Sequence, residues 1–114
     1  MTASGIKIGA RAIVIALSAH QSDLERLCRQ FHVRRLEIFG SALDDSFDRL
    51  RSDLDFLVEF SPLTPIDYAA AFFGFKESLE DLFGCPVDLI VSSAIRNPYF
   101  RQSVENSKAL LYAA

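Results

Sequence analysis

The sequence predicts a single α/β domain, and three observations support this fold class. Segments 33–39, 55–59 and 87–91 are apolar and rich in β-forming side chains, which is typical of strands. Apolar residues at helical spacing precede the first of these segments and fill the stretch between the second and the third. Residue types that commonly begin or end helices, such as Thr64, Pro65 and Gly84, mark the boundaries of the long helical stretch. The expected order of helix, strand, strand, helix, strand and helix describes one layered α/β structure.

The first half of the chain contains one expected helix and one expected strand. From Gln21 onward, four apolar residues recur at helical spacing with charged residues on the other face, namely Leu24, Leu27, Cys28 and Phe31. Val33–Phe39 alternates loosely and predicts a strand. A loop with five charged residues is expected over Gly40–Ser52.

The second half begins with an expected strand over Asp55–Glu59, whose central apolar run indicates burial on both faces. Thr64 and Pro65 suit the N-cap and first position of a helix over Ile66–Phe83, and Gly84 suits its end. The remaining elements follow in sequence order: a strand over Val87–Val91, a helix over Pro98–Asn106, and a tail, Ala109–Tyr112, that fits an edge strand or a frayed helix end.

Length and charge narrow the function classes. The 114 residues suffice for one core, so we expect a loose N-terminal segment over 1–17 and one domain over 18–114. The net charge of −3 predicts no direct nucleic-acid binding and no attraction to an anionic membrane, and Ile13–Ala19 is too short to span one. The two cysteines, Cys28 and Cys85, have no metal-site spacing and are expected to be reduced thiols in a cytoplasm.

Two aspartates at the mouth of the second strand are the first candidate site. Asp53 and Asp55 are separated by one residue, so in a strand they share a face. Two close carboxylates repel unless a cation lies between them, and Mg²⁺ prefers carboxylate, phosphate and water oxygens. Gly40 and Ser41, just upstream, offer backbone N–H groups and a hydroxyl to a phosphate. The pattern predicts a site for a metal-bound nucleoside triphosphate.

Asp88 is a carboxylate inside the otherwise apolar third strand, where aspartate is poorly suited. One interpretation places it at a sheet edge, with its carboxylate in solvent. The other makes it a third carboxylate beside Asp53 and Asp55, as two-metal phosphoryl transfer requires.

These residues resemble the minimal nucleotidyltransferase domain family, within the polymerase-β-like nucleotidyltransferase superfamily. The matching motifs are Phe39-Gly40-Ser41, Ser52-Asp53-Leu54-Asp55 and Val87-Asp88-Leu89, with further similarity in Asn97-Pro98-Tyr99-Phe100 and Leu110-Leu111-Tyr112.

The resemblance implies a small mixed sheet backed by helices, and it implies roles. Gly40 and Ser41 would hold the triphosphate of ATP. Asp53 and Asp55 would ligate Mg²⁺, and Asp88 would complete the metal site or act as a base. The implied activity is that of an antitoxin, which transfers AMP from ATP to a tyrosine of a small helical HEPN-type toxin.

The sequence departs from the family pattern in the loop after Ser41. Leu43-Asp44-Asp45 stands where the family usually has Ala-Arg-Gly. Arg49 or Arg51 would replace the lost positive charge. Lys76, on the helix before the third strand, is a candidate triphosphate contact or else a solvated lysine.

The sequence leaves other functions open. One is a nucleotidyltransferase-fold binding module that has lost turnover and neutralises its partner by occlusion, and a weaker one is transfer to a small molecule or an RNA end. The phenylalanines of the run Phe72–Phe75 exceed what one helix face buries, so they form a partner surface or pack under the N-terminal segment. A homo-oligomer also stays open.

Overall fold

The computed structural model describes residues 17–40, 54–106 and 108–114 of the chain. Four strands form one sheet in the order β3-β2-β1-β4. The strands are β1 (Val33–Phe39), β2 (Leu54–Phe60), β3 (Val87–Val91) and β4 (Ala109–Ala113). Strand β1 runs antiparallel to β2 and β4, whereas β2 runs parallel to β3. The predicted small mixed sheet is confirmed, and the C-terminal tail is a strand.

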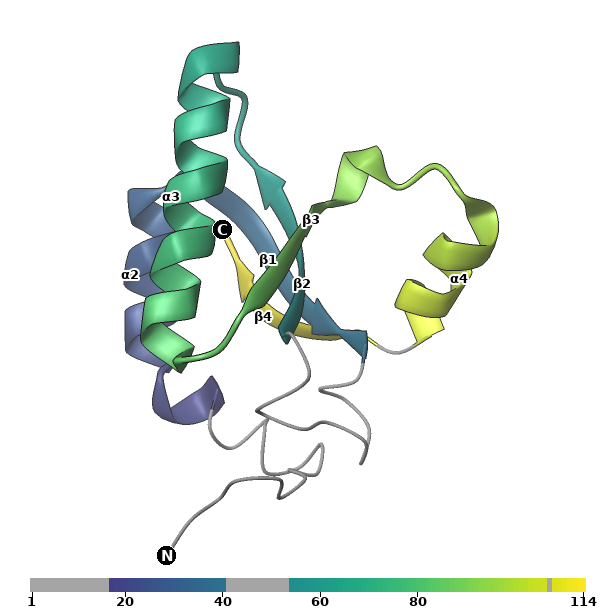
Figure 1. The fold of residues 1–114 in the computed structure, drawn as a ribbon, viewed down its shortest axis with the longest axis horizontal. Helices are drawn as coiled ribbons and strands as arrows, with labels where there is room; N and C mark the ends of the chain where they lie inside the picture. The colour runs from purple at the N-terminus through teal and green to yellow at the C-terminus, as the bar shows by residue number, and fades with distance from the viewer. Residues whose placement is uncertain (1–16, 41–53, 107) are drawn as a thin grey trace, which may run out of the picture.

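The described helices lie on both sides of this sheet (Figure 1). They are α2 (Gln21–Gln30), α3 (Pro65–Phe83) and α4 (Pro98–Asn106), with a short 3₁₀ turn, η2 (Ser92–Ala94), after β3. Figure 1 shows α2 and α3 against one face of the sheet and α4 on the other side. Helix α3 supplies the crossover that a parallel β2–β3 pair requires.

The ends of α3 have the predicted capping residues. The Thr64 hydroxyl accepts a hydrogen bond from the Asp67 backbone N–H at 3.2 Å, and Pro65 begins the helix. Gly84 ends it in the left-handed region, with φ of 67°, and its N–H donates to the Glu80 carbonyl at 2.8 Å. The chain therefore turns sharply at this point and leads into β3.

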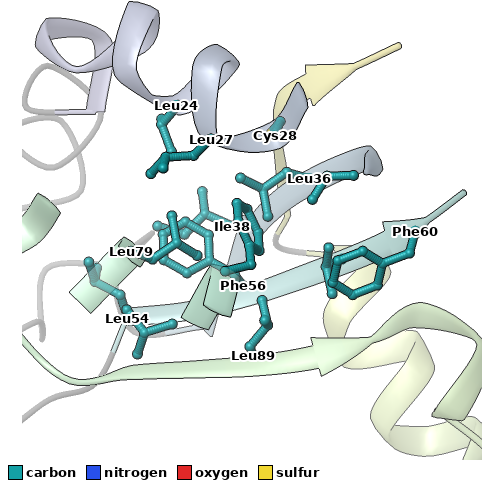
Figure 2. Packing of buried hydrophobic residues seen from close by; sticks show 14 of the residues in the cluster. Leu24, Leu27, Cys28, Leu36, Ile38, Leu54, Phe56, Phe60, Leu79 and Leu89 are labelled. Carbon is teal, nitrogen blue, oxygen red and sulfur yellow. The ribbon is translucent and has the colours of Figure 1, made fainter. Parts of the chain in front are cut away.

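The main core lies between the sheet and the pair α2–α3 (Figure 2). Alternate side chains of β2 point into it, so Leu54, Phe56, Val58 and Phe60 are all buried. Leu24 and Leu27 of α2 face these strands in Figure 2, as does Leu79 of α3. This face of the sheet is apolar along its length, and it holds the largest buried side chains.

A second, smaller apolar cluster lies on the opposite face, under α4. Phe39, Leu57 and Val104 are buried in it, and Ile90 and Ile95 pack against it. Leu57 alternates with Phe56 along β2, so the two residues point to opposite faces. The apolar run of β2 is therefore buried on both faces, as the sequence predicted.

The phenylalanines of α3 divide between the core and the surface. Phe75 is fully buried, whereas Phe73 is 67% exposed. The alternative, that these phenylalanines pack under the N-terminal segment, involves residues 1–16, which lie outside the described part of the chain. Most of the predicted loose segment over 1–17 lies outside it as well. Cys28 is buried and Cys85 is partly buried, and the two form no disulfide. No helix in the described residues is long and apolar enough to cross a membrane.

Candidate active site

Asp55 and Asp88 lie directly opposite each other on neighbouring strands. They are register partners in the parallel pair β2–β3, and neighbouring strands are about 4.8 Å apart. Leu54 and Phe56 flank Asp55 and point into the main core, and Val87 and Leu89 flank Asp88 in the same way. Both aspartates therefore project from the other face, which is the face that α4 partly covers. The sheet brings these two predicted site residues together.

Gly40 lies against the Asp55 carboxylate. It follows Phe39, which is the β1 register partner of Asp55, and its φ of 78° is in the left-handed region that favours glycine. A Cβ atom at this position would collide with the Asp55 Oδ2 atom. The absence of a side chain at Gly40 therefore allows the carboxylate to lie beside the backbone at the end of β1.

The predicted loop residues fall outside the described part of the chain. Ser41, Asp53 and the acidic positions Asp44 and Asp45 all lie in the segment 41–53. Their proposed roles stay predictions. Leu54, the first described residue after this segment, donates its N–H to the Pro86 carbonyl at 3.0 Å. This bond fixes the start of β2 against the residue that precedes β3.

The donor set at this edge suits a hard cation. Asp55 is half-buried and Asp88 is exposed, so one carboxylate is held by its surroundings and the other is open to solvent. Within the described residues no trio of His, Cys, Asp or Glu is arranged as a metal site. Two same-face carboxylates with a bare glycine alongside fit part of a Mg²⁺–phosphate site, for which Asp53 would be the further ligand.

Lys76 is not brought to this edge. It lies on α3, which covers the other face of the sheet, and its Nζ atom is 3.1 Å from Glu80 Oε2. Glu80 Oε2 also accepts a hydrogen bond from the Val87 N–H at 3.0 Å. The Val87 N–H bond, followed by the bond from Lys76, lowers the pKa of Glu80. Lys76 thus helps to attach α3 to the start of β3, and its predicted triphosphate contact gains no support from this position.

A buried carboxylate that we did not single out from the sequence lies on the same face. Glu37 is 4% exposed, between Leu36 and Ile38 of β1. Its Oε2 atom is 3.1 Å from Lys108 Nζ and 3.3 Å from Arg35 Nη2. Glu37 could have been selected from the sequence by the feature that marked Asp88, a charged residue inside an expected strand.

Lys108 joins this cluster to the end of α4. Its Nζ atom is 3.0 Å from Glu105 Oε1, and the hydrogen bond to Glu105, together with that to Glu37, raises the pKa of Lys108. The ion pairs therefore connect α4 and the start of β4 to the interior strand β1, on the face from which the aspartates project.

Taken together, a mixed α/β sheet with facing aspartates at its strand ends and a glycine against one of them has the architecture of a nucleotide-transfer domain. The family model described as "Nucleotidyltransferase domain" matches residues 23–111. The chain belongs to this nucleotidyltransferase family and is an enzyme of that class.

Named relatives agree with this assignment. A Methanocaldococcus jannaschii protein, provisionally named a protein adenylyltransferase, is 42% identical over 80 residues, which are 69% of this chain and 76% of that protein. The protein adenylyltransferase MntA of Thermococcus cleftensis is 32% identical over 81 residues, covering 71% of this chain and 75% of that protein.

Solved structures share the fold. A structure described as a minimal nucleotidyltransferase aligns with a TM-score of 0.63 at 28% identity, covering 92% of this chain and 98% of that one. A complex of tri-AMPylated Shewanella oneidensis HEPN toxin with MNT antitoxin contains a chain that aligns with a TM-score of 0.58 at 19% identity, covering 86% of this chain and 73% of that one. At this identity the second likeness concerns the fold alone.

Proposed function

We propose that this nucleotidyltransferase uses Mg²⁺ to transfer AMP from ATP to a hydroxyl of a HEPN-type partner protein, with tyrosine as the expected acceptor, and that it thereby acts as an antitoxin. The observation that carries the proposal is the facing pair Asp55–Asp88, with Gly40 against Asp55. Relatives named protein adenylyltransferase support the nature of the reaction. The toxin–antitoxin neighbours support the nature of the partner.

Each site residue has a role in this proposal. Asp53 and Asp55 would hold Mg²⁺, Asp88 would complete the metal site or act as the base, and the backbone N–H groups at Gly40 and Ser41 would bind the triphosphate. Mg²⁺, when bound, neutralises charge on the phosphate oxygens and on the departing pyrophosphate. Phe39 and Leu57, buried beside the aspartates, give this edge an apolar floor that excludes water from one side.

The transfer itself is a substitution at phosphorus. The acceptor oxygen forms a bond to the α-phosphorus of ATP, and the bond from that phosphorus to the bridging oxygen of pyrophosphate breaks. The hydroxyl proton passes to a carboxylate. Asp88 suits this part because it is exposed and can return the proton to solvent. We place the reaction in the cytoplasm, where the thiols of Cys28 and Cys85 stay reduced.

Intact-mass spectrometry tests the proposal. The purified protein, ATP, Mg²⁺ and the HEPN-type protein encoded in the same genome should yield a partner that has gained AMP. Asp55→Asn should abolish the addition and Asp88→Asn should strongly reduce it, whereas Asp81→Asn, an exposed carboxylate on α3, should leave it unchanged.

The acidic sequence Leu43-Asp44-Asp45 favours the alternative of a binding module without turnover, since it places aspartates where an arginine is usual. With the enzyme in excess and a long incubation, slow transfer still yields an adduct. If no adduct forms while the partner's toxicity is suppressed, occlusion replaces transfer as the function.

A further inference from the structure

Helix α4 carries exposed aromatic side chains on the same side of the sheet as the aspartate pair. Tyr99 is 86% exposed and Phe100 is 41% exposed. The Phe100 ring lies edge-on to the Phe39 ring, with 6.1 Å between centroids, and Phe39 is the register partner of Asp55. The exposed aromatics thus adjoin the strand end at which the aspartates project. We call Arg96, Tyr99 and Phe100 the α4 ledge.

Several contacts hold the backbone of the ledge against the rest of the domain. The Asn97 side chain accepts hydrogen bonds from the N–H groups of Tyr99 and Phe100 at 2.8 Å and 3.2 Å. Arg101 donates from Nη2 to the carbonyls of Ser92 and Ile95 at 3.0 Å and 3.2 Å. Val104 is buried against the sheet. These contacts fix the backbone of the helix, so binding at the ledge need not order it first.

The charge of the ledge differs from that of the whole chain. Its exposed Arg96 is positively charged, and no acidic residue occurs between Asp88 and Glu105, although the chain has a net charge of −3. Tyrosine, phenylalanine and arginine are enriched in protein–protein interfaces. This combination fits a partner segment that offers apolar side chains next to an acidic one.

The position of the transfer site limits which surface receives the acceptor protein. The aspartates project from the face that α4 partly covers, so an acceptor hydroxyl has to approach from that face. Among the described residues, Leu110 is also exposed, on the edge strand β4 at the far side of the sheet from β3, and Ile66 and Phe73 are exposed on α3, behind the opposite face. An acceptor docked on α3 would be separated from the aspartates by the sheet.

We infer that the α4 ledge is the docking surface for the acceptor protein, which binds it through an apolar segment carrying an acidic residue next to the hydroxyl that receives AMP. This inference rests on the proposed function. A symmetric pairing of two ledges is disfavoured, because it would place the Arg96 side chains of two copies close together.

The test measures transfer kinetics with the HEPN-type protein of the same genome as acceptor. Tyr99→Ala should raise KM for that protein at least about tenfold, with kcat little changed, because aromatic residues at the centre of an interface dominate binding. Arg96→Glu should act in the same direction. Phe73→Ala on α3 is the matched control, because it also removes an exposed phenyl-type side chain, and it should leave KM unchanged. Alanine is a strong helix former, so the Tyr99 variant keeps α4 folded.

Several outcomes would overturn the inference. One is a wild-type KM for Tyr99→Ala, and another is a raised KM for Phe73→Ala alone. A third is weaker Mg²⁺–ATP binding by Tyr99→Ala in calorimetry, which would make the ledge a platform for the nucleobase. A fourth is dissociation of a homo-oligomer by Tyr99→Ala in size-exclusion chromatography, which would make it a self-interface. If wild-type protein transfers no AMP, the proposed function fails, and the Kd of the two proteins still tests docking with the same variants.

Discussion

The two faces of the sheet differ in what they carry. The face under α2 and α3 is apolar along every described strand, and it buries Phe56 and Phe75 completely. The face under α4 carries four strand carboxylates among the described residues, Glu37, Asp55, Glu59 and Asp88, around a small apolar cluster. One sheet therefore separates the packing that stabilises the fold from the polar groups that serve its chemistry. Substitutions on the two faces should have different consequences.

The largest expected loss of stability comes from a substitution on the face under α2 and α3. Phe56→Ala removes a fully buried ring from the core and should lower the free energy of unfolding by about 3–5 kcal/mol. Chemical denaturation measures it. Phe73→Ala, which truncates an exposed phenylalanine of α3, should change this free energy by less than about 0.5 kcal/mol. Similar losses in the two variants would show that the core is not where the structure places it.

The second expected effect is on the carboxylate face. Lys108→Met removes an ammonium group 3.1 Å from the buried Glu37 and leaves that carboxylate with Arg35. The free energy of unfolding should fall by about 2 kcal/mol, because a buried charge loses a partner. Arg26→Met breaks only the exposed pair with Asp23, so it should cost less than about 0.5 kcal/mol. Equal losses would mean that the Glu37 cluster adds no more than a surface ion pair.

A third substitution separates backbone strain from site geometry. Gly40→Ala places a side chain at positive φ and against Asp55, so it should cost about 1–2 kcal/mol and reduce AMP transfer at least about tenfold. Gly84→Ala, also at positive φ but at the end of α3, should cost similar stability and retain transfer measured well below its melting temperature. Retained transfer in the Gly40 variant would remove Gly40 from the site.

The smallest expected effect depends on pH. The pKa of Glu80 is lowered by its bond from the Val87 N–H and then by Lys76, so the folded state favours the ionised form. This contribution is present above the unfolded-state pKa of glutamate and is lost as the pH falls through the lower folded-state pKa. The melting temperature of Glu80→Gln should therefore lie slightly below that of wild type at neutral pH and converge with it in acid. Glu77→Gln, exposed on the same helix, is the control, and a pH-independent Glu80 difference would contradict the linkage.

Local patterns in the sequence predicted most of the elements. Thr64, Pro65 and Gly84 mark the ends of α3 because capping depends on neighbouring residues alone. The tail Ala109–Tyr112 could not be assigned, since its strand exists only through pairing with β1, more than sixty residues away. Periodicity predicted that aspartates share a face within one strand. It could not predict that Asp55 and Asp88 are register partners.

The remaining site contacts are also long-range. The sequence marked Gly40 as a turn residue, but its close approach to the Asp55 carboxylate depends on the β1–β2 pairing. Lys76 was selected for its charge and its place on a helix, and helical spacing alone does not say which side of the sheet that helix covers. Glu37 showed the same signal as Asp88, and Arg35 is two residues away on β1, but the second cationic partner, Lys108, became visible only when α4 and β4 were placed.

The central claim is that the carboxylate face binds a metal-bound nucleotide, and thermal melts with and without Mg²⁺–ATP test it most directly. Binding to the folded state stabilises it, by about 2.7 kcal/mol when the ligand is at a hundred times its Kd. Wild type and the control Asp81→Asn should therefore gain melting temperature in Mg²⁺–ATP, whereas Asp55→Asn and Asp88→Asn should gain little. The melts without ligand check that each variant is folded. An equal gain in all four proteins would contradict the assignment of Asp55 and Asp88 to the site.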